Sequence, residues 1–82
     1  MTKQKRIQKN LALSAEFNTY LFRHPNMMEK LPNNVCIVFE ARNDKVFTRA
    51  NLKTAEELPN PKKCFVASKS GTRWSIRPLL NV

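Results

Sequence analysis

A strand–helix–strand pattern in the middle of the chain constrains the fold more than any other feature. Residues Val35–Glu40 form a run of mainly apolar residues, several of them β-branched or aromatic, that does not alternate. Such a run is typical of a strand covered on both faces, as the central strand of a parallel sheet is. A helix is predicted over Lys45–Leu58, because Asn43 and Asp44 can each cap its start and two prolines follow it. The next apolar run, Lys63–Ser68, completes a crossover unit, whose two strands we expect to be parallel.

Two helices are predicted before this unit. Residues Lys3–His24 contain no Gly or Pro and are rich in helix formers. They predict one long helix, which ends where Pro25 disfavours helical geometry at the residue before it. The next segment, Pro25–Pro32, is bracketed by prolines, and its first proline suits the first turn of a short helix.

A β-hairpin is predicted after the crossover unit. The segment Lys69–Thr72 contains the only glycine of the chain, Gly71, where a tight hairpin needs a positive φ. Residues Arg73–Arg77 alternate between polar and apolar side chains, which is typical of a half-exposed edge strand. In this pattern Trp74 points away from the arginines, so we expect it to belong to the core.

Together these elements predict one domain, residues 1–82, at the boundary between the α/β and α+β classes. Their order is a long N-terminal helix, a short helix, and then a β-α-β-β arrangement with a three-stranded mixed sheet. We expect the first two strands to be parallel and the last to lie antiparallel beside the second. A chain of 82 residues has room for one hydrophobic core and no second domain.

The N-terminal helix has an apolar face that is wider than one neighbour needs. On a helical wheel its apolar residues cover an arc of about 220°, whereas a surface helix needs a stripe of about 100°. We therefore expect contact with two neighbours, either the sheet and another helix or the sheet and a second subunit. A homodimer through this helix is one prediction, and burial within a thin core is the alternative. The residues of the arc are Ile7, Leu11, Leu13, Ala15, Phe17, Tyr20, Leu21 and Phe22.

Few residues in the sequence could perform chemistry. Cys36 and Cys64 both lie in apolar runs, where a free thiol behaves as a small hydrophobic side chain. The single histidine, His24, has no Cys or second His at a metal-ligand spacing. Glu40 and Asp44 follow a strand where α/β sheets place their ligands, but Asp44 is better explained as a helix cap. We therefore expect a binding protein that is not an enzyme, with no catalytic residues, no metal and no cofactor.

The sequence also bears on location. No stretch approaches the about 20 apolar residues that a membrane-spanning helix needs. The basic N-terminus is not followed by an uninterrupted apolar region of a signal peptide, because Ser14 and Glu16 break it. We expect a cytoplasmic protein with no membrane partner.

The charge of the chain indicates the kind of partner. Fifteen Lys and Arg residues against six Asp and Glu residues give a formal net charge of +9. Such an excess favours association with polyanions. Weak, non-specific binding to RNA or DNA is the predicted function. The alternative is a protein-interaction component that binds an acidic partner, for example one half of a toxin–antitoxin pair.

Two groups of cations are the candidate nucleic-acid-binding residues. One group recurs every four positions along one side of the central predicted helix, and the other surrounds the hairpin. Because the aromatic residues are segregated from these cations, we expect phosphate contact without reading of bases. The candidate residues are Lys45, Arg49, Lys53, Lys69, Arg73 and Arg77.

Several segments resemble a known family. The likeness is strongest in the N-terminal helix, over Lys9–Phe17, and continues through Val35–Phe39 and Ala50–Leu52. In these segments the chain is similar to a family of small bacterial proteins of unknown function. The resemblance implies the same order of elements and no particular activity. Members of that family are more acidic in the loop before the second long helix, where this sequence has Arg42 and Lys45.

Overall fold

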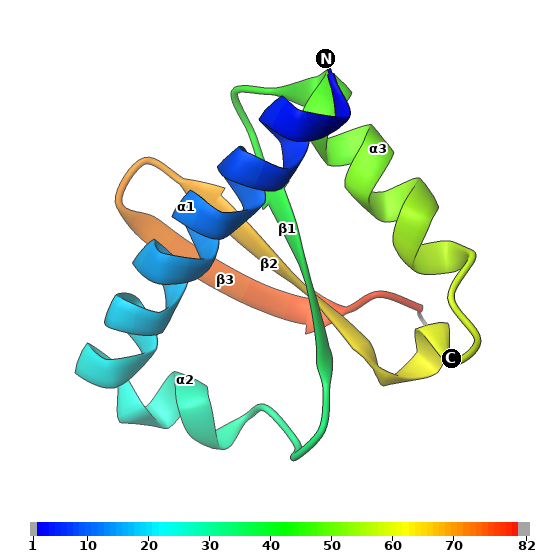
Figure 1. Cartoon of the computed structure of the whole chain (residues 1–82). Coiled ribbons are helices and arrows are strands. Elements are labelled where there is room, and N and C mark those ends of the chain that lie inside the picture. Colours follow the sequence, from blue (N-terminus) through cyan, green and yellow to red (C-terminus); the bar gives the residue numbers. More distant parts are fainter. Residues whose placement is uncertain (1, 81–82) are drawn as a thin grey trace.

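The computed structural model of the chain describes residues 2–80 (Figure 1). It confirms the predicted mixed α and β fold and the predicted order of its elements. These are α1 (Lys3–Arg23), α2 (Pro25–Glu29), β1 (Cys36–Ala41), α3 (Lys45–Glu56), the short 3-10 helix η1 (Pro61–Lys63), β2 (Cys64–Ser70) and β3 (Arg73–Pro78).

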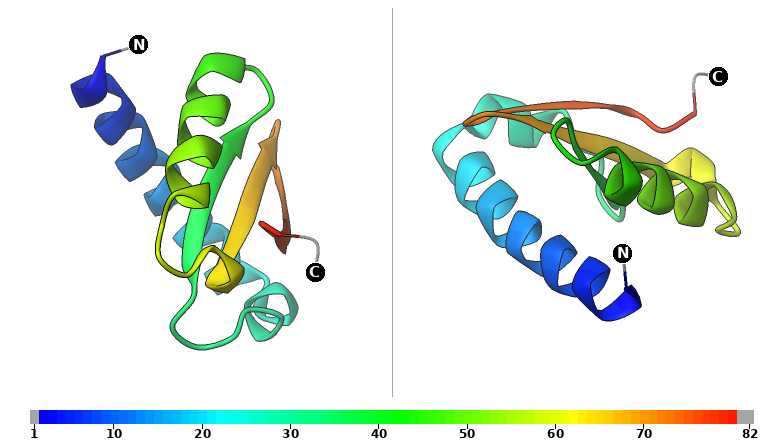
Figure 2. Two further views of the ribbon diagram at one scale, coloured as in Figure 1. Left: turned by 90° about the vertical axis from the view of Figure 1, so that its right-hand side faces the viewer. Right: turned by 90° about the horizontal axis from the view of Figure 1, so that it is seen from above.

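The strands form one mixed sheet in the order β1-β2-β3. As predicted, β1 and β2 are parallel, and β3 is antiparallel to β2. The central strand is β2, however, and β1 lies at an edge. The continuous apolar run of β1 has a different cause. Helix α1 packs on one of its faces and α3 on the other, so both faces are covered although β1 pairs with a strand on one edge only (Figure 2).

Local signals in the sequence set the ends of the elements. The side chain of Asp44 caps α3 by accepting a hydrogen bond from the N–H of Phe47, at 3.1 Å. The side chain of Thr2 does the same for α1 at the N–H of Lys5. Gly71 has a φ of 63°, which gives the turn between β2 and β3 the backbone that glycine adopts without strain.

The larger part of the core lies between α1 and the sheet. Leu13, Phe17 and Leu21 recur every four residues and form the buried stripe of α1. Phe17 packs against Phe39 and Trp74, with ring centroids 5.8 and 5.0 Å apart, so Trp74 is a core residue as predicted. The predicted apolar arc is only partly used. Ile7, Leu11 and Phe22 remain 50%, 67% and 84% exposed.

A smaller core lies between α3 and the other face of the sheet. It contains Val38, Ala55, Cys64 and Val66, with Cys36, Leu52 and Leu79 packed against it. The two cysteines are free thiols, of which Cys64 is buried, in line with their prediction as small apolar residues.

The helix predicted over Lys45–Leu58 ends at Glu56, and its buried face is not wholly apolar. The buried residues of α3 are Phe47, Asn51 and Ala55, whereas Val46 in the helix and Leu58 after it are 63% and 41% exposed. A polar residue therefore stands in the middle of the buried face.

Candidate nucleic-acid interface

One flank of α3 carries the predicted row of cations. Lys45, Arg49 and Lys53 are all exposed, and the four-residue spacing places them on one side of the helix. They line a groove of about 460 Å³ together with Arg42, which lies in the loop before the helix. The groove also contains Glu40 and Glu56, so its charge is mixed but mainly positive.

The sheet beside this groove presents further polar groups. Cross-strand register places Arg73, Ser75 and Arg77 of β3 on the same face as Glu40 and Ser68. Because α3 packs mainly on β1, the side chains of these β3 residues stay exposed. We call this surface the cationic face; its cations are Arg42, Lys45, Arg49, Lys53, Arg73 and Arg77.

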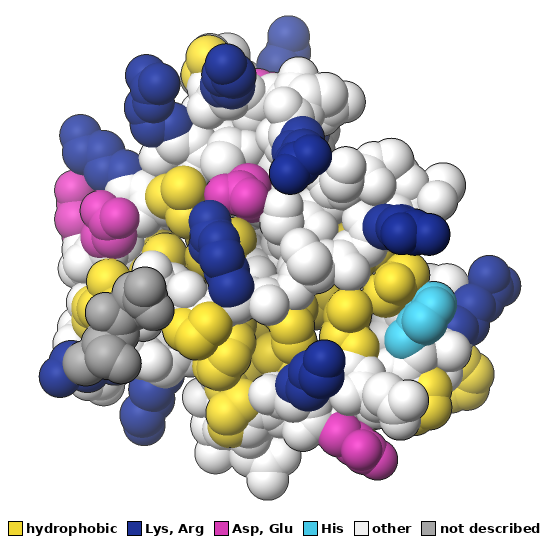
Figure 3. Space-filling view, turned by 180° about the vertical axis from the view of Figure 1, so that it is seen from behind, with side chains coloured by type: hydrophobic (Ala, Val, Ile, Leu, Met, Phe, Trp, Pro, Cys, Tyr) yellow, Lys and Arg dark blue, Asp and Glu magenta, His cyan; other side chains and the backbone are white. Residues whose placement is uncertain are grey.

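An ion pair lies within the cationic face. Arg77 Nη2 donates to Glu40 Oε2 at 2.9 Å, and the Ser68 hydroxyl donates to Glu40 Oε1, also at 2.9 Å. Arg77 therefore has an acidic partner before any ligand arrives. Figure 3, a view from behind, shows Lys and Arg side chains spread around few acidic ones, with a band of hydrophobic side chains between them.

The remaining candidate, Lys69, lies on the opposite face of the sheet. Its register partner is Trp74, and its ammonium group pairs with Glu16 of α1. Lys69 and Arg73 both border a depression between α1 and the hairpin, which His24 also lines. The His24 ring stacks on Tyr20 there, with centroids 3.8 Å apart. The structure therefore gathers Lys45, Arg49 and Lys53 in one groove. It places Arg73 and Arg77 on the sheet face that bears Glu40, and Lys69 on the opposite face.

The other flank of α3 is attached to α1 and β1 by side-chain hydrogen bonds of Asn51, which the sequence analysis did not predict. We call this set of hydrogen bonds the polar joint. Asn51 and Asn10 exchange two side-chain hydrogen bonds, at 3.1 and 2.9 Å. Asn51 also donates to the backbone carbonyl of Phe39 at 3.0 Å. Nothing local in the sequence distinguishes Asn51 from a solvated asparagine, because its partners lie in α1 and β1. This joint fixes α3 to both α1 and the edge of the sheet.

A salt bridge strengthens the same contact between helices. Lys9 of α1 donates to Asp44 Oδ2 at 2.8 Å, and its ammonium group lies 5.0 Å from the ring centroid of Phe47. The hydrogen bond from Lys9, followed by that from the backbone of Phe47, lowers the pKa of Asp44. Asp44 is thus a helix cap and an anchor for α1, in agreement with its interpretation as a cap.

The thiol chemistry of Cys36 is also constrained. Desolvation by burial, then the hydrogen bond with Cys64 and the charge of Cys64, together raise the pKa of Cys36 to about 11. The thiolate is the nucleophilic form of cysteine, so Cys36 is protonated and unreactive near neutral pH.

Charge pairing consumes few of the cations. Among residues 2–80 the structure records three ion pairs, formed by Lys9, Lys69 and Arg77.

No three His, Cys, Asp or Glu side chains in that part of the chain are grouped so that they could hold a metal ion. No helix within the same residues is both long enough and apolar enough to cross a membrane.

Comparison with known proteins adds a family and no activity. The model of a family described as "Family of unknown function (DUF5647)" matches residues 5–79. No curated protein and no solved structure shows a significant match to the chain.

Proposed function

We propose that this chain, which belongs to the DUF5647 family of unknown function, binds the phosphate backbone of RNA or DNA through its cationic face. The binding is weak, sensitive to salt and independent of base sequence. The role is one of binding, with no catalysis and no cofactor.

The observation that carries the proposal is the row Lys45, Arg49 and Lys53 on α3. No ion pair is recorded for these three residues in the described chain, and all three are exposed. Four residues of helix rise about 6 Å, so the charges are spaced along one line and can contact successive phosphates. Arg42 lines the same groove.

The composition of the face supports contact with phosphates rather than bases. No aromatic residue lines the groove beside α3. Trp74 is buried on the other face of the sheet, against Phe17 and Phe39. Reading or stacking bases needs exposed rings or groups that reach base edges, so phosphates are the favoured ligand.

The test is a titration of the full chain against labelled single-stranded and duplex nucleic acid at two salt concentrations. The variant removes the row by Lys45→Ala, Arg49→Ala and Lys53→Ala together. A matched control removes three exposed lysines elsewhere, Lys30→Ala, Lys62→Ala and Lys63→Ala, and so has the same net charge.

The row variant is expected to lower the slope of log affinity against log salt by about 2 to 3, since each phosphate contact contributes about 0.7 to 0.9. The control is expected to keep most of the slope. Absence of binding at low salt contradicts the proposal, and so do equal losses in the two variants. The second result would show that net charge alone governs binding.

An acidic protein partner is the alternative occupant of the same face. A partner of this kind, such as one half of a toxin–antitoxin pair, would contact the same cations with carboxylates instead of phosphates. Binding of poly-glutamate by the chain, together with no binding of nucleic acid, would favour this alternative.

Self-association through α1 also stays a prediction. It is supported by two exposed apolar side chains of the helix, Leu11 and Phe22. Sedimentation at several concentrations tests it, and a monomer at high concentration would contradict it.

A cytoplasmic location, where RNA and DNA are accessible to a bacterial protein, is part of the proposal that the chain binds nucleic acid.

A further inference from the structure

The free edge of β1 is only partly closed. The N–H of Arg42 donates to the carbonyl of Lys69 in β2, so the backbone groups of the even-numbered residues point toward β2. Those of Ile37, Phe39 and Ala41 therefore point away from the sheet. An edge of this kind is a template for pairing with another strand unless something covers it.

Side chains of α3 cover the C-terminal half of this edge. Thr48 Oγ1 accepts from the N–H of Ala41 at 2.9 Å and donates to the carbonyl of Ala41 at 3.0 Å. Asn51 donates to the carbonyl of Phe39. Farther along, the groove is lined by Ala55 of α3 and by Leu58, which follows the helix, and neither has a polar side chain to offer. The hydroxyl of Thr54, which also lines the groove, accepts a hydrogen bond from Arg6 at 3.2 Å. The N–H and carbonyl of Ile37 and the N–H of Phe39 are thus left for another partner.

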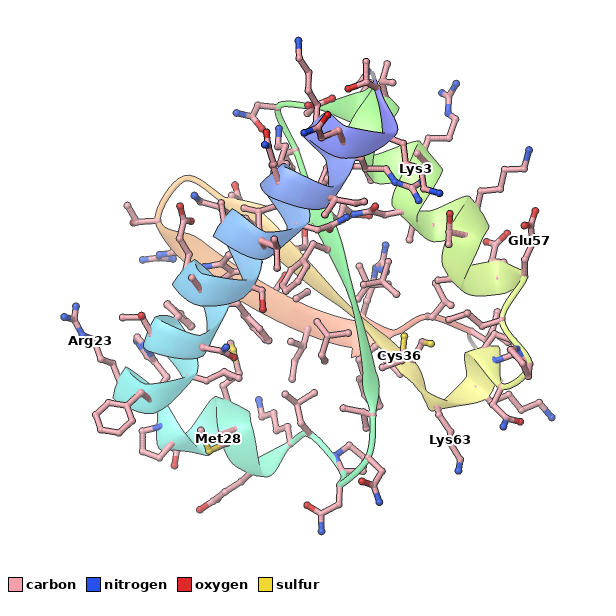
Figure 4. All side chains as sticks on the ribbon, viewed as in Figure 1. Lys3, Arg23, Met28, Cys36, Glu57 and Lys63 are labelled. Carbon is pink, nitrogen blue, oxygen red and sulfur yellow. The ribbon has the colours of Figure 1, made fainter. Side chains whose placement is uncertain are left out.

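These groups lie at the floor of an apolar groove between α1 and α3. In Figure 1, β1 runs between the two helices, and Figure 4 labels Cys36 on this strand. The groove has a volume of about 420 Å³ and is walled by Ile7, Leu11 and Leu58, which are 50%, 67% and 41% exposed. We call it the edge groove. Arg6 is the one charged residue among those that line it in the described chain.

We propose that the edge groove binds an extended segment of a partner protein, which adds a fourth strand beside β1. Backbone groups of the segment pair with Ile37 and Phe39, and its apolar side chains cover Ile7, Leu11 and Leu58. An acidic residue of the segment pairs with Arg6. This site and its ligand are separate from the cationic face.

The shape and charge of the groove favour a single extended segment over a second copy of the chain. The edge of β1 is recessed between two helices, so the equally recessed edge of another copy cannot reach it. Two copies would also bring two basic N-terminal helices together, each with Lys3, Lys5, Arg6 and Lys9. The opposite edge of the sheet is less suited to pairing, because β3 carries Arg73 and Arg77 and ends at Pro78.

The test is selection of a random dodecapeptide library against the full chain, followed by affinity measurement on the selected peptides. We expect sequences that alternate apolar residues and carry an acidic residue. Their binding should fall at least tenfold in Leu11→Glu, which places an acid in the groove wall. It should be unchanged in the matched control Val46→Glu, an exposed apolar position of α3 outside the groove.

Two further measurements report on the backbone pairing itself. Hydrogen exchange of the amides of Ile37 and Phe39 is expected to be fast in the free chain and slow with peptide bound. The amides of Val38 and Glu40 should be slow in both, because they face β2. A peptide with the same side chains but methylated backbone nitrogens should not bind.

Three outcomes would overturn the proposal. The first is that selection yields no peptides, or peptides without the acidic and apolar pattern. The second is equal binding to Leu11→Glu and Val46→Glu. The third is a dimer that Leu11→Glu disrupts with protection of the same two amides, which would identify a second copy as the occupant.

Discussion

The two flanks of α3 differ in chemistry although they belong to one helix. On one side Lys45, Arg49 and Lys53 line a groove with exposed charge. On the other side Asn51 and Ala55 line the edge groove, where backbone groups and apolar carbon are exposed. The first surface suits a ligand attracted over long range by its charge, and the second suits one that is held by burial and main-chain hydrogen bonds. The helix therefore separates a charged surface from an apolar one, and its attachment to the sheet keeps the two apart.

Loss of the attachment of α3 to α1 and β1 is expected to have the largest effect on stability. Asn51→Ala removes the joint and leaves Asn10 and the carbonyl of Phe39 without a partner, at a cost of about 1 to 3 kcal/mol for each unsatisfied group. We expect the free energy of unfolding to fall by about 2 to 4 kcal/mol in total, measured by urea denaturation. Glu56→Ala, at an exposed position of the same helix with no recorded hydrogen bond to α1 or the sheet, is the control and should cost far less. A loss equal to that of the control would show that the joint is not what holds α3.

The affinities of the two grooves for their ligands should depend differently on salt concentration. Between 50 and 200 mM salt, three phosphate contacts predict a fall in nucleic-acid affinity of roughly 20- to 40-fold. A peptide in the edge groove has one charged contact, at Arg6, so its affinity is expected to change by less than about threefold over the same range. Anisotropy titrations of both ligands on one protein sample measure this difference. Equal salt dependence would mean that both ligands occupy the cationic face.

High pH should weaken the floor of the edge groove. The pKa of Cys36 is raised from its ordinary value of 9.0 to about 11, so between these values the unfolded chain loses this proton and the folded chain keeps it. Stability is therefore expected to fall as pH rises from 9 to 11, and to fall less in Cys36→Val, measured as urea midpoints at pH 8 and 10.5. Identical slopes in the two proteins would contradict the role of the thiol.

Low pH should give a smaller effect at the contact between α1 and α3. The pKa of Asp44 is lowered below its ordinary value of 3.8, so the ionised form of Asp44 contributes stability above that pH. This contribution is lost as pH falls through the folded pKa. Asp44→Asn can still cap α3 but cannot pair with Lys9, so its thermal midpoint should change less between pH 6 and pH 3 than that of the wild type. A larger fall in the thermal midpoint of the variant between pH 6 and pH 3 would contradict a stabilising ion pair between Asp44 and Lys9.

Local signals explain why the fold could be predicted from the sequence. Pro25, Asp44 and Gly71 each influence the backbone of their immediate neighbours. The helices and strands that begin or end beside these residues are found at the expected places. The edge position of β1 was not evident from its apolar run. Coverage of both faces gives the same pattern in a central strand and in an edge strand held between two helices.

The candidate site was less predictable because pairing of charges is a tertiary property. The row on α3 follows from helical spacing alone, and the structure gathers it as expected. The partners of Lys69 and Arg77, which are Glu16 and Glu40, are far away in sequence, so the sequence shows the cations but not their neutralisation. Asn51 and its partner Asn10 are also far apart in sequence, so their hydrogen bonds could not be predicted from it.

The packing of Phe17 on Trp74 has a consequence for the order of events during synthesis. The buried stripe of α1 is made before the strands that cover it, and its last aromatic neighbour lies in β3. A nascent chain therefore exposes Leu13, Phe17 and Leu21 until the hairpin has left the ribosome. Because α1 is translated before the strands that enclose it, chaperones have the greatest opportunity to bind the chain in that interval.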